Sequence, residues 1–185
     1  MSKQIVLVFL FIGGFITAVA SLQSCKKASF TPIFTNEPEI ITTLKIEFKD
    51  AATGQILTYY YRDMDGDSIN APIQLDTIRL NANATYFTSI KFLDESNPDA
   101  VANVTHEIKS EAVNHLVCLN ASANTFIIRT DNDGTFPLGL ESKWMNGLAS
   151  TGDFTVSLKH QAGFKNGSCE IGETDLEVVF PMAIM

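Results

Sequence analysis

Basic residues are scarce in this chain, and their scarcity excludes one large class of partners. There are 13 Lys and Arg against 21 Asp and Glu among 185 residues, for a formal net charge of −8 at pH 7. Nucleic acids are bound by surfaces of clustered positive charge, because their backbone carries a negative phosphate at every nucleotide. An acidic chain does not fit that role, and we interpret its charge as a solvated surface.

The chain also lacks an apolar run long enough to remain in a bilayer as a helix. The longest run, Ile5–Ala20, covers 16 residues and contains Gly13 and Gly14, whereas a spanning helix needs about 20. Lys3 precedes the run, and small or polar residues follow it, which is typical of a cleaved export signal. We therefore predict that residues 1–24 are a signal peptide.

Recognisable catalytic motifs are missing as well. The sequence has no Gly-x-Ser-x-Gly elbow, no phosphate-binding glycine loop and no pair of carboxylates on a known catalytic framework. We therefore predict that the protein is not an enzyme. A glycan-cleaving enzyme is the alternative, and it would need two carboxylates about 5–9.5 Å apart in a cleft.

Cysteine occurs only three times, and the first has the setting of a lipid attachment site. Residues 22–25, Leu-Gln-Ser-Cys, resemble the lipobox of bacterial lipoproteins, in which a diacylglyceryl group is joined to the cysteine sulfur by a thioether. The alternative is an ordinary secretory signal followed by a coincidental cysteine. The sequence thus predicts cleavage before Cys25, lipidation of Cys25, a tether over residues 25–38 and one folded domain over residues 39–185.

Cys118 and Cys169 are the two remaining thiols. In an exported protein an even pair favours a disulfide, which would close a loop of about fifty residues. The alternative is a buried thiol at Cys118 and an exposed thiol at Cys169. Both interpretations stay open at this point.

Strict alternation of apolar and charged residues dominates the chain beyond Pro38. Leu44–Lys49 exchanges the two kinds at every step, the period of a half-buried strand. Val104–Asn114 alone competes as a short helix, with Ile108 and Ala112 on one face. The other predicted strands are Ile56–Arg62, Ile73–Leu80, Thr85–Leu93, His115–Asn120, Thr125–Thr130, Phe154–His160 and Leu176–Ile184.

This pattern predicts an all-β fold. Seven to eight short strands separated by polar turns are typical of an antiparallel, Ig-like or Greek-key β-sandwich, here with one short crossover helix. A closed barrel around a ligand cavity is the alternative, because strand count does not reveal closure.

Alternating carboxylates mark a candidate calcium loop. Asp63, Asp65 and Asp67 surround Gly66 in the way that a calcium loop opens. A complete EF-hand loop would carry Glu at the twelfth position, where Gln74 stands instead. The alternative is an acidic hairpin turn. The segment at residues 131–134, Asp-Asn-Asp-Gly, is a weaker version that we expect to be a turn.

Histidines and carboxylates supply a second candidate metal site, for zinc or a similar ion. If residues 104–114 are helical, Glu111 and His115 fall on one stripe of that helix. His160 has the parity of the apolar face of its strand, and Glu170, Glu173 and Asp175 follow in the next loop, with Glu173 as the predicted ligand. Imidazole and carboxylate groups are ordinary zinc ligands. The alternative is that each histidine merely packs or caps, since no His-x-His or His-x3-His pair exists.

From about residue 36 to the end, the chain resembles small lipoproteins of Bacteroidetes. The resemblance is carried by Glu39–Leu44, Leu80–Tyr86, Leu158–Gln161 and Gly172–Val178. Some relatives are labelled as a type 1 periplasmic-binding fold, a large two-lobed α/β structure that a short β-rich chain does not fit. The family has no established activity, so it transfers no functional residue.

The resemblance implies a role in uptake, because such genes often lie near TonB-dependent receptors. We expect a non-enzymatic binding or accessory module that serves a receptor of this kind. A structural or interaction protein of the envelope, without a small ligand, is the alternative. Surface-displayed lipoproteins of these bacteria often carry an acidic run after the cysteine, whereas Lys26 and Lys27 follow Cys25 here. We therefore expect an outer-membrane lipoprotein that faces the periplasm.

Lipidation is directly testable. Mass spectrometry of the mature protein should find Cys25 at its N-terminus and carrying lipid. Cys25→Ser should move the protein from the membrane fraction to the soluble fraction, because two or three acyl chains hold a protein far more firmly than none. An unmodified thiol at Cys25, or an intact leader in the mature product, would contradict the prediction.

Overall fold

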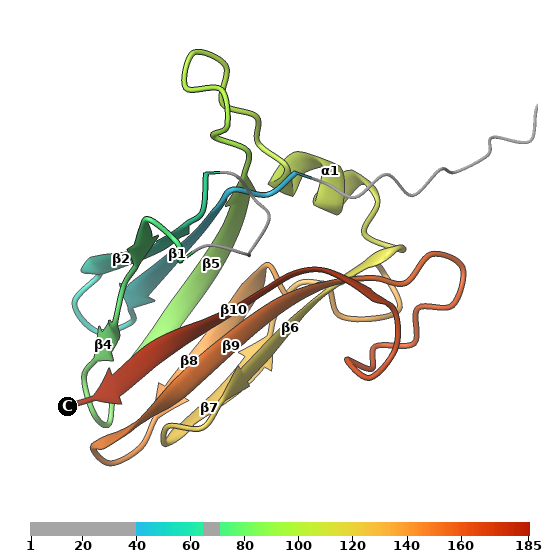
Figure 1. Cartoon of the computed structure of the whole chain (residues 1–185). Coiled ribbons are helices and arrows are strands. Elements are labelled where there is room, and N and C mark those ends of the chain that lie inside the picture. Colours follow the sequence, from blue (N-terminus) through green and yellow to red (C-terminus); the bar gives the residue numbers. More distant parts are fainter. Residues whose placement is uncertain (1–39, 65–70) are drawn as a thin grey trace, which may run out of the picture. The chain divides into compact units, whose positions relative to one another are not determined.

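The computed structural model describes residues 40–64 and 71–185, which form a sandwich of two β-sheets (Figure 1). One sheet has six strands in the order β3-β2-β1-β5-β8-β7, and the other has four in the order β4-β10-β9-β6. The strands are β1 (Thr43–Asp50), β2 (Ile56–Arg62), β3 (Gln74–Leu75), β4 (Ile78–Leu80), β5 (Thr85–Leu93), β6 (His115–Ala121), β7 (Thr125–Arg129), β8 (Glu141–Asn146), β9 (Ser150–His160) and β10 (Glu173–Ile184). The all-β sandwich is confirmed.

The described residues all belong to one compact unit of the chain. The predicted domain boundary at residue 39 lies outside them. The predicted signal peptide, the tether and Cys25 lie outside the described residues, as do Asp65 and Asp67 of the candidate calcium loop.

A chain of aromatic side chains joins the two sheets at their inner faces. Trp144 of the six-stranded sheet contacts Phe48 of the same sheet at 5.0 Å and Phe154 of the four-stranded sheet at 4.7 Å between ring centroids. Both contacts are edge-to-face, the arrangement favoured by the ring quadrupoles. All three side chains are fully buried, which places the centre of the core at this contact.

Strand β8 was missed from the sequence because its inner face is partly polar. Ser142, Trp144 and Asn146 are all buried, so apolar alternation does not mark the strand. The Trp144 indole N–H donates to the Ser142 hydroxyl at 2.9 Å, and the Asn146 amide donates to the carbonyl of Asn81 at 2.9 Å. These bonds satisfy buried polar groups that would otherwise destabilise the fold.

The single strand predicted over Ile73–Leu80 is wrong, because the chain changes sheets within it. Asp76 exchanges hydrogen bonds with Tyr60, donating its N–H to the carbonyl and accepting the Tyr60 N–H at its carboxylate. β3 ends before Asp76, and β4 begins after it and pairs in parallel with β10. Within residues 40–64 and 71–185 the sandwich therefore has ten strands and one parallel pair, where seven to eight antiparallel strands were predicted.

The helix is shorter than predicted. α1 covers Thr105–Ser110, and its Ile108 side chain is fully buried. The hydrogen bond from Glu111 N–H to the Glu107 carbonyl closes it, and residues 112–114 form a turn. Across residues 40–64 and 71–185, no helix has the length and hydropathy needed to cross a membrane.

A disulfide ties the β9–β10 loop to β6. Cys118 and Cys169 are bonded with a Cα–Cα distance of 5.9 Å, so the disulfide interpretation of this pair is the correct one. The same loop is held from inside by Gln161, which is fully buried. Its amide donates to the carbonyls of Ser168 and Ile171 at 2.7 and 2.8 Å. The loop that leads from β9 to β10 is therefore restrained by the disulfide and by the two hydrogen bonds from Gln161.

Removing the disulfide should lower the free energy of unfolding without changing the fold. Cys118→Ser/Cys169→Ser frees a loop of 51 residues, and the chain-entropy model then predicts a loss of about 3–4 kcal/mol. Denaturant unfolding of the oxidised protein, the reduced protein and the double variant measures this loss. Reductant should leave the double variant unaffected, and equal stability of the oxidised and reduced protein would contradict the prediction.

Candidate metal centre

Two histidines meet at the end of the four-stranded sheet. His115 is the first residue of β6 and lies directly opposite His160, the last residue of β9. Their rings contact edge-to-face with centroids 4.9 Å apart. Opposite residues of an antiparallel pair share one face of the sheet, so both side chains extend the inward row that contains Val117 and Leu158. His115 is almost completely buried, and His160 is half-buried.

A bulge in β10 adds a carboxylate to the two rings. The register between β9 and β10 shifts between Thr174 and Leu176, which leaves Asp175 as an extra residue. A bulged residue is released from strict alternation, so its side chain can be redirected. Ligand atoms of His115, His160 and Asp175 all lie within 4.8 Å of one another. This group of three is the candidate metal centre.

Gly172 allows the chain to enter β10 beside this centre. Its φ of +94° lies in the left-handed region, and a Cβ there would stand 2.5 Å from the carbonyl oxygen of His160. Any other residue would be strained and would also collide with the backbone that carries His160. The glycine therefore permits the close return of the loop that brings Asp175 to the histidines.

The backbone of α1 orients the His115 ring. The Nδ1 atom lies 3.2 Å from the carbonyl oxygen of Glu111, and a carbonyl can only accept. Nδ1 therefore carries the hydrogen, and Nε2 is the ring nitrogen with a lone pair when the ring is neutral. Burial lowers the pKa of His115, the bond to Glu111 opposes this effect, and the nearby His160 adds to it. The ring is therefore neutral at pH 7.

Asp175 supplies the one carboxyl group of the three residues. Burial raises its pKa, and His160 and His115 counteract that rise, while Glu173 adds to it. Its buried Oδ2 atom has no hydrogen-bond partner among the described residues. A buried carboxylate oxygen without a partner is costly, and a bound cation would relieve that cost.

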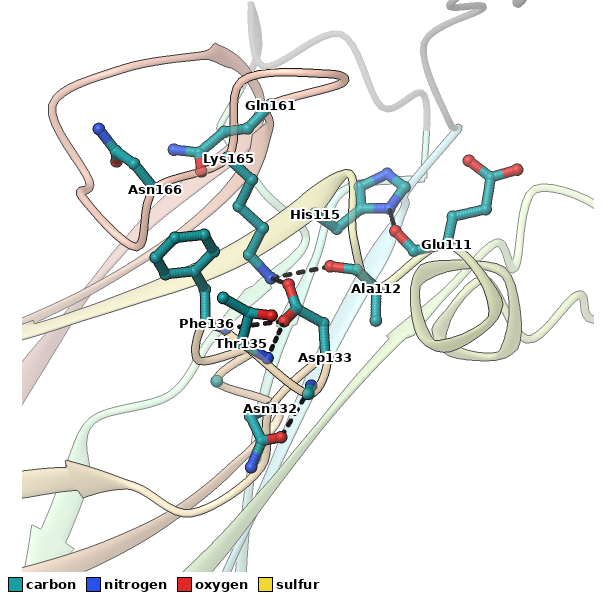
Figure 2. A network of polar contacts seen from close by, with 12 residues as sticks. Glu111, Ala112, His115, Asn132, Asp133, Thr135, Phe136, Gln161, Lys165 and Asn166 are labelled. Carbon is teal, nitrogen blue, oxygen red and sulfur yellow. Dashed lines mark hydrogen bonds and ion pairs between the residues drawn. The ribbon is translucent and has the colours of Figure 1, made fainter.

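The structure joins only part of the predicted metal site. His115 and His160 come together as predicted, but the carboxylate in the group is Asp175 instead of Glu111 or Glu173. Glu111 contributes its main-chain oxygen, and its carboxylate points away from the His115 ring in Figure 2, because α1 ends before His115 and the expected helical stripe does not form. Glu173 is opposite His160 in register with an exposed side chain.

The acidic loop candidates have different outcomes. Asp63 is buried and accepts a hydrogen bond from the Tyr61 hydroxyl at 3.1 Å, and the rest of the candidate calcium loop lies outside the described residues. The expected turn at residues 131–134 is confirmed. There the Asp133 carboxylate accepts the N–H groups of Thr135 and Phe136 at 2.8 and 2.7 Å.

Comparison of the chain with protein-family models, with curated proteins and with solved structures finds no match. The sequence signal for Asp175 was the acidic cluster at residues 170–175, and nothing in its spacing could distinguish Asp175 from Glu173. The bulge that selects between them forms only when β9 and β10 pair.

A buried ion pair joins three loops, one of them the turn that precedes His115 (Figure 2). Lys165 Nζ is 2.8 Å from Asp133 Oδ2 and donates to the carbonyl of Ala112 at 2.8 Å. Both side chains are at most 4% exposed. Burial alone would raise the pKa of Asp133, but the bonds from Lys165, Phe136 and Thr135 outweigh it and lower the pKa to about 2.

The stabilisation from this ion pair depends on pH in a definite direction. The pKa of Asp133 is about 2 in the folded protein against an ordinary value of 3.8, so the folded state holds the charged form more strongly than the unfolded state does. The contribution is therefore complete above about pH 4 and is lost as the pH falls toward 2.

Lys165→Met should lower the free energy of unfolding by about 3 kcal/mol or more, because it leaves the Asp133 charge buried without its partner. Denaturant unfolding at pH 7 and at pH 2.5 measures the effect, and the loss should be smaller at the lower pH. Lys109→Met is the matched control, since Lys109 lies 4.0 Å from Glu141 with both side chains more than half exposed. Equal effects of the two variants would contradict the assignment.

Proposed function

We propose that this protein is an exported lipoprotein whose β-sandwich binds a divalent transition-metal ion, zinc or a similar ion, through His115, His160 and Asp175. The observation that carries the proposal is the meeting of their ligand atoms within 4.8 Å, from three neighbouring strands of one sheet. Two imidazoles and one carboxylate form a common protein ligand set for zinc, with a further position left to water or another donor.

The surroundings of the three residues support metal binding. Ligating histidines usually donate the other ring N–H to a carbonyl or carboxylate, which fixes the tautomer. The bond between His115 Nδ1 and the Glu111 carbonyl meets that condition and directs Nε2 to act as the ligand atom. Ligand atoms around zinc lie roughly 3.3 Å apart at bond lengths of about 2.0–2.1 Å. The half-buried side chains of His160 and Asp175 would move inward to reach that spacing.

The restraints on the β9–β10 loop support a preformed metal site. His160 and Asp175 stand at the two ends of the β9–β10 loop, and the disulfide and Gln161 hold that loop in place. A site whose ligands are already held near their bound positions loses little conformational entropy on binding. This rigidity favours a binding module over a catalyst that must open and close.

The lipid anchor and the uptake role extend the proposal beyond the sandwich. The lipobox at Cys25 motivates attachment to membrane lipid, and the resemblance to Bacteroidetes lipoproteins motivates service to a TonB-dependent receptor. In this role the domain holds a metal or metal-containing nutrient at the periplasmic side of the outer membrane. A structural envelope protein in which the same three residues merely stabilise the sheet end is the competing function.

Zinc titration by calorimetry tests the metal centre. His160→Ala and Asp175→Asn should each weaken binding by more than the roughly 10–100-fold typical of outer-shell substitutions, because each removes a ligand atom. His106→Ala is the matched control and should leave binding unchanged, since that exposed histidine on α1 forms its side-chain hydrogen bond with Asn103 and is not one of the three candidate ligands. Absence of zinc binding by the unaltered protein would reject the metal function and leave the structural one.

The pH dependence of binding provides a second check. Protons compete with the metal for the histidine nitrogens, so zinc affinity should be greatest near pH 7 and above and should fall on acidification. The lowered pKa of His115 keeps this ring available to lower pH than an ordinary histidine with a pKa of 6.5. Zinc affinity that stays constant between pH 7 and pH 5 would show that histidine nitrogens are not ligands.

A further inference from the structure

The outward face of the six-stranded sheet carries an unusual row of side chains. Lys49 is paired with Ile56 on one side and Phe87 on the other, and Phe87 and Ile128 are both paired with Lys143. These pairs follow one another across five strands, so the row runs roughly 19 Å at about 4.8 Å per strand. We call this row the Lys–Phe–Lys stripe. Its members in order are Ile56, Lys49, Phe87, Lys143 and Ile128.

The apolar members of the stripe are exposed to solvent. Ile56 is 56% exposed, Phe87 is 52% exposed and Ile128 is 42% exposed. Phe126, 62% exposed, lies two residues from Ile128 on the same face of β7. Single exposed apolar residues are common, but a contiguous group of them on one face marks an interaction surface.

The two lysines of the stripe have no acidic partner among the described residues. The neighbouring row contains Glu47 and Glu141, but Glu47 pairs with Lys45 at 2.7 Å and Glu141 with Lys109 at 4.0 Å. No ion pair of the described chain involves Lys49 or Lys143. Two cations thus flank an exposed aromatic ring at positions directly opposite it in register.

Charge on this face opposes the charge of the whole chain. Its strands point five cations and two carboxylates outward, and Glu95, which follows β5 and pairs with Arg62 at 3.1 Å, adds a third carboxylate, for a balance of +2, whereas the chain carries −8. On the outward face of the other sheet, the strands carry two cations and two carboxylates, so the net charge of that face is zero. The cations are Lys45, Lys49, Arg62, Lys91 and Lys143 on the first face and Arg79 and Lys159 on the second, and the carboxylates are Glu47, Glu95 and Glu141 on the first face and Asp153 and Glu177 on the second.

We propose that the Lys–Phe–Lys stripe docks on the surface of an anionic lipid bilayer. Exposed hydrocarbon side chains enter the interfacial region, and lysines between them pair with lipid phosphates. A hollow of about 270 Å³ beside the stripe gives room for a headgroup, and its lining includes Lys49, Ile56 and Phe87 together with Glu47, Ser89 and Glu141. An acidic polysaccharide fits less well, because three of the five side chains of the stripe, Ile56, Phe87 and Ile128, are exposed hydrocarbon that offers its hydroxyls no hydrogen bond.

The chain between Cys25 and β1 is long enough for the stripe to reach the membrane that would hold the lipid anchor. This part of the inference rests on the proposed function, which includes that anchor. Residues 25–39 could extend by roughly 50 Å at about 3.3–3.6 Å per residue. β1 enters the six-stranded sheet at Thr43, and Lys49 is six residues further along the same strand. The anchored domain could therefore lay this face on the membrane that holds it.

Brominated lipids test the docking through a tryptophan placed in the stripe. The chain has one tryptophan, the fully buried Trp144, so Phe87→Trp adds a single exposed reporter. The full chain carrying this change is reconstituted into vesicles with brominated acyl chains. Fluorescence should be quenched in phosphatidylglycerol vesicles and much less in phosphatidylcholine vesicles. Raising the salt concentration to 0.5 M should abolish the difference, because ions screen the lysines.

Matched charge variants distinguish docking through the stripe from a general attraction between the cations of the protein and anionic lipid. Lys49→Gln/Lys143→Gln in the reporter chain should lower the ratio of docked to undocked protein about 30-fold. Arg79→Gln/Lys159→Gln removes the same charge from the other sheet and should leave the ratio unchanged. Equal loss in both variants, or equal quenching in the two lipids, would overturn the proposal. A response to soluble acidic polysaccharide without quenching by phosphatidylglycerol would also overturn it, in favour of a glycan surface.

Failure of docking and failure of the proposed function give different results. Sedimentation of the full chain with both kinds of vesicle reports the lipid anchor, independently of quenching at position 87. Zinc titration of Lys49→Gln/Lys143→Gln reports the metal centre, which involves residues of the other sheet only. Loss of quenching with both of these retained would reject the docking alone.

Discussion

Burial of the inner face of the four-stranded sheet is the constraint on which the rest depends. Phe154, Val156 and Leu158 of β9 are fully buried, and each faces a partner on β6 and on β10. A slip of one residue would turn this whole row toward water, so the register cannot shift at a tolerable cost. His115 and His160 continue the same row at its end, and their contact is therefore as firmly specified as the core itself.

The end of the sandwich where the histidines meet is held by several kinds of bond. The disulfide from Cys118, the amide of Gln161 and the buried pair of Lys165 and Asp133 all act on the β9–β10 loop or its neighbours. Each reduces the freedom of a segment that carries or supports a ligand candidate. A concentration of stabilising bonds at one end of a domain is expected where a site must be held in a defined geometry.

Particular elements show where sequence reasoning succeeded. Ile56–Arg62 and Thr85–Leu93 were predicted with the bounds that the structure has. The three tyrosines of the first segment favour a pleated surface, and burial alternates along the second. β8 was missed because Ser142 and Asn146 interrupt the apolar pattern while remaining buried. The change of sheet at Asp76 was missed for a related reason, since hydrogen bonds to Tyr60 decide it and apolar periodicity does not report them.

The sequence alone determined the all-β class, most strand positions and the parity that places His160 on the inward face. It also contained both cysteines of the disulfide, but not the fact of their bonding. Only the tertiary structure decided that Asp175 is the third member of the metal centre, because a bulge in β10 and the left-handed turn at Gly172 arise from pairing with β9. Periodicity reports the burial of a residue along its own strand, whereas ligand sets depend on contacts between strands distant in sequence.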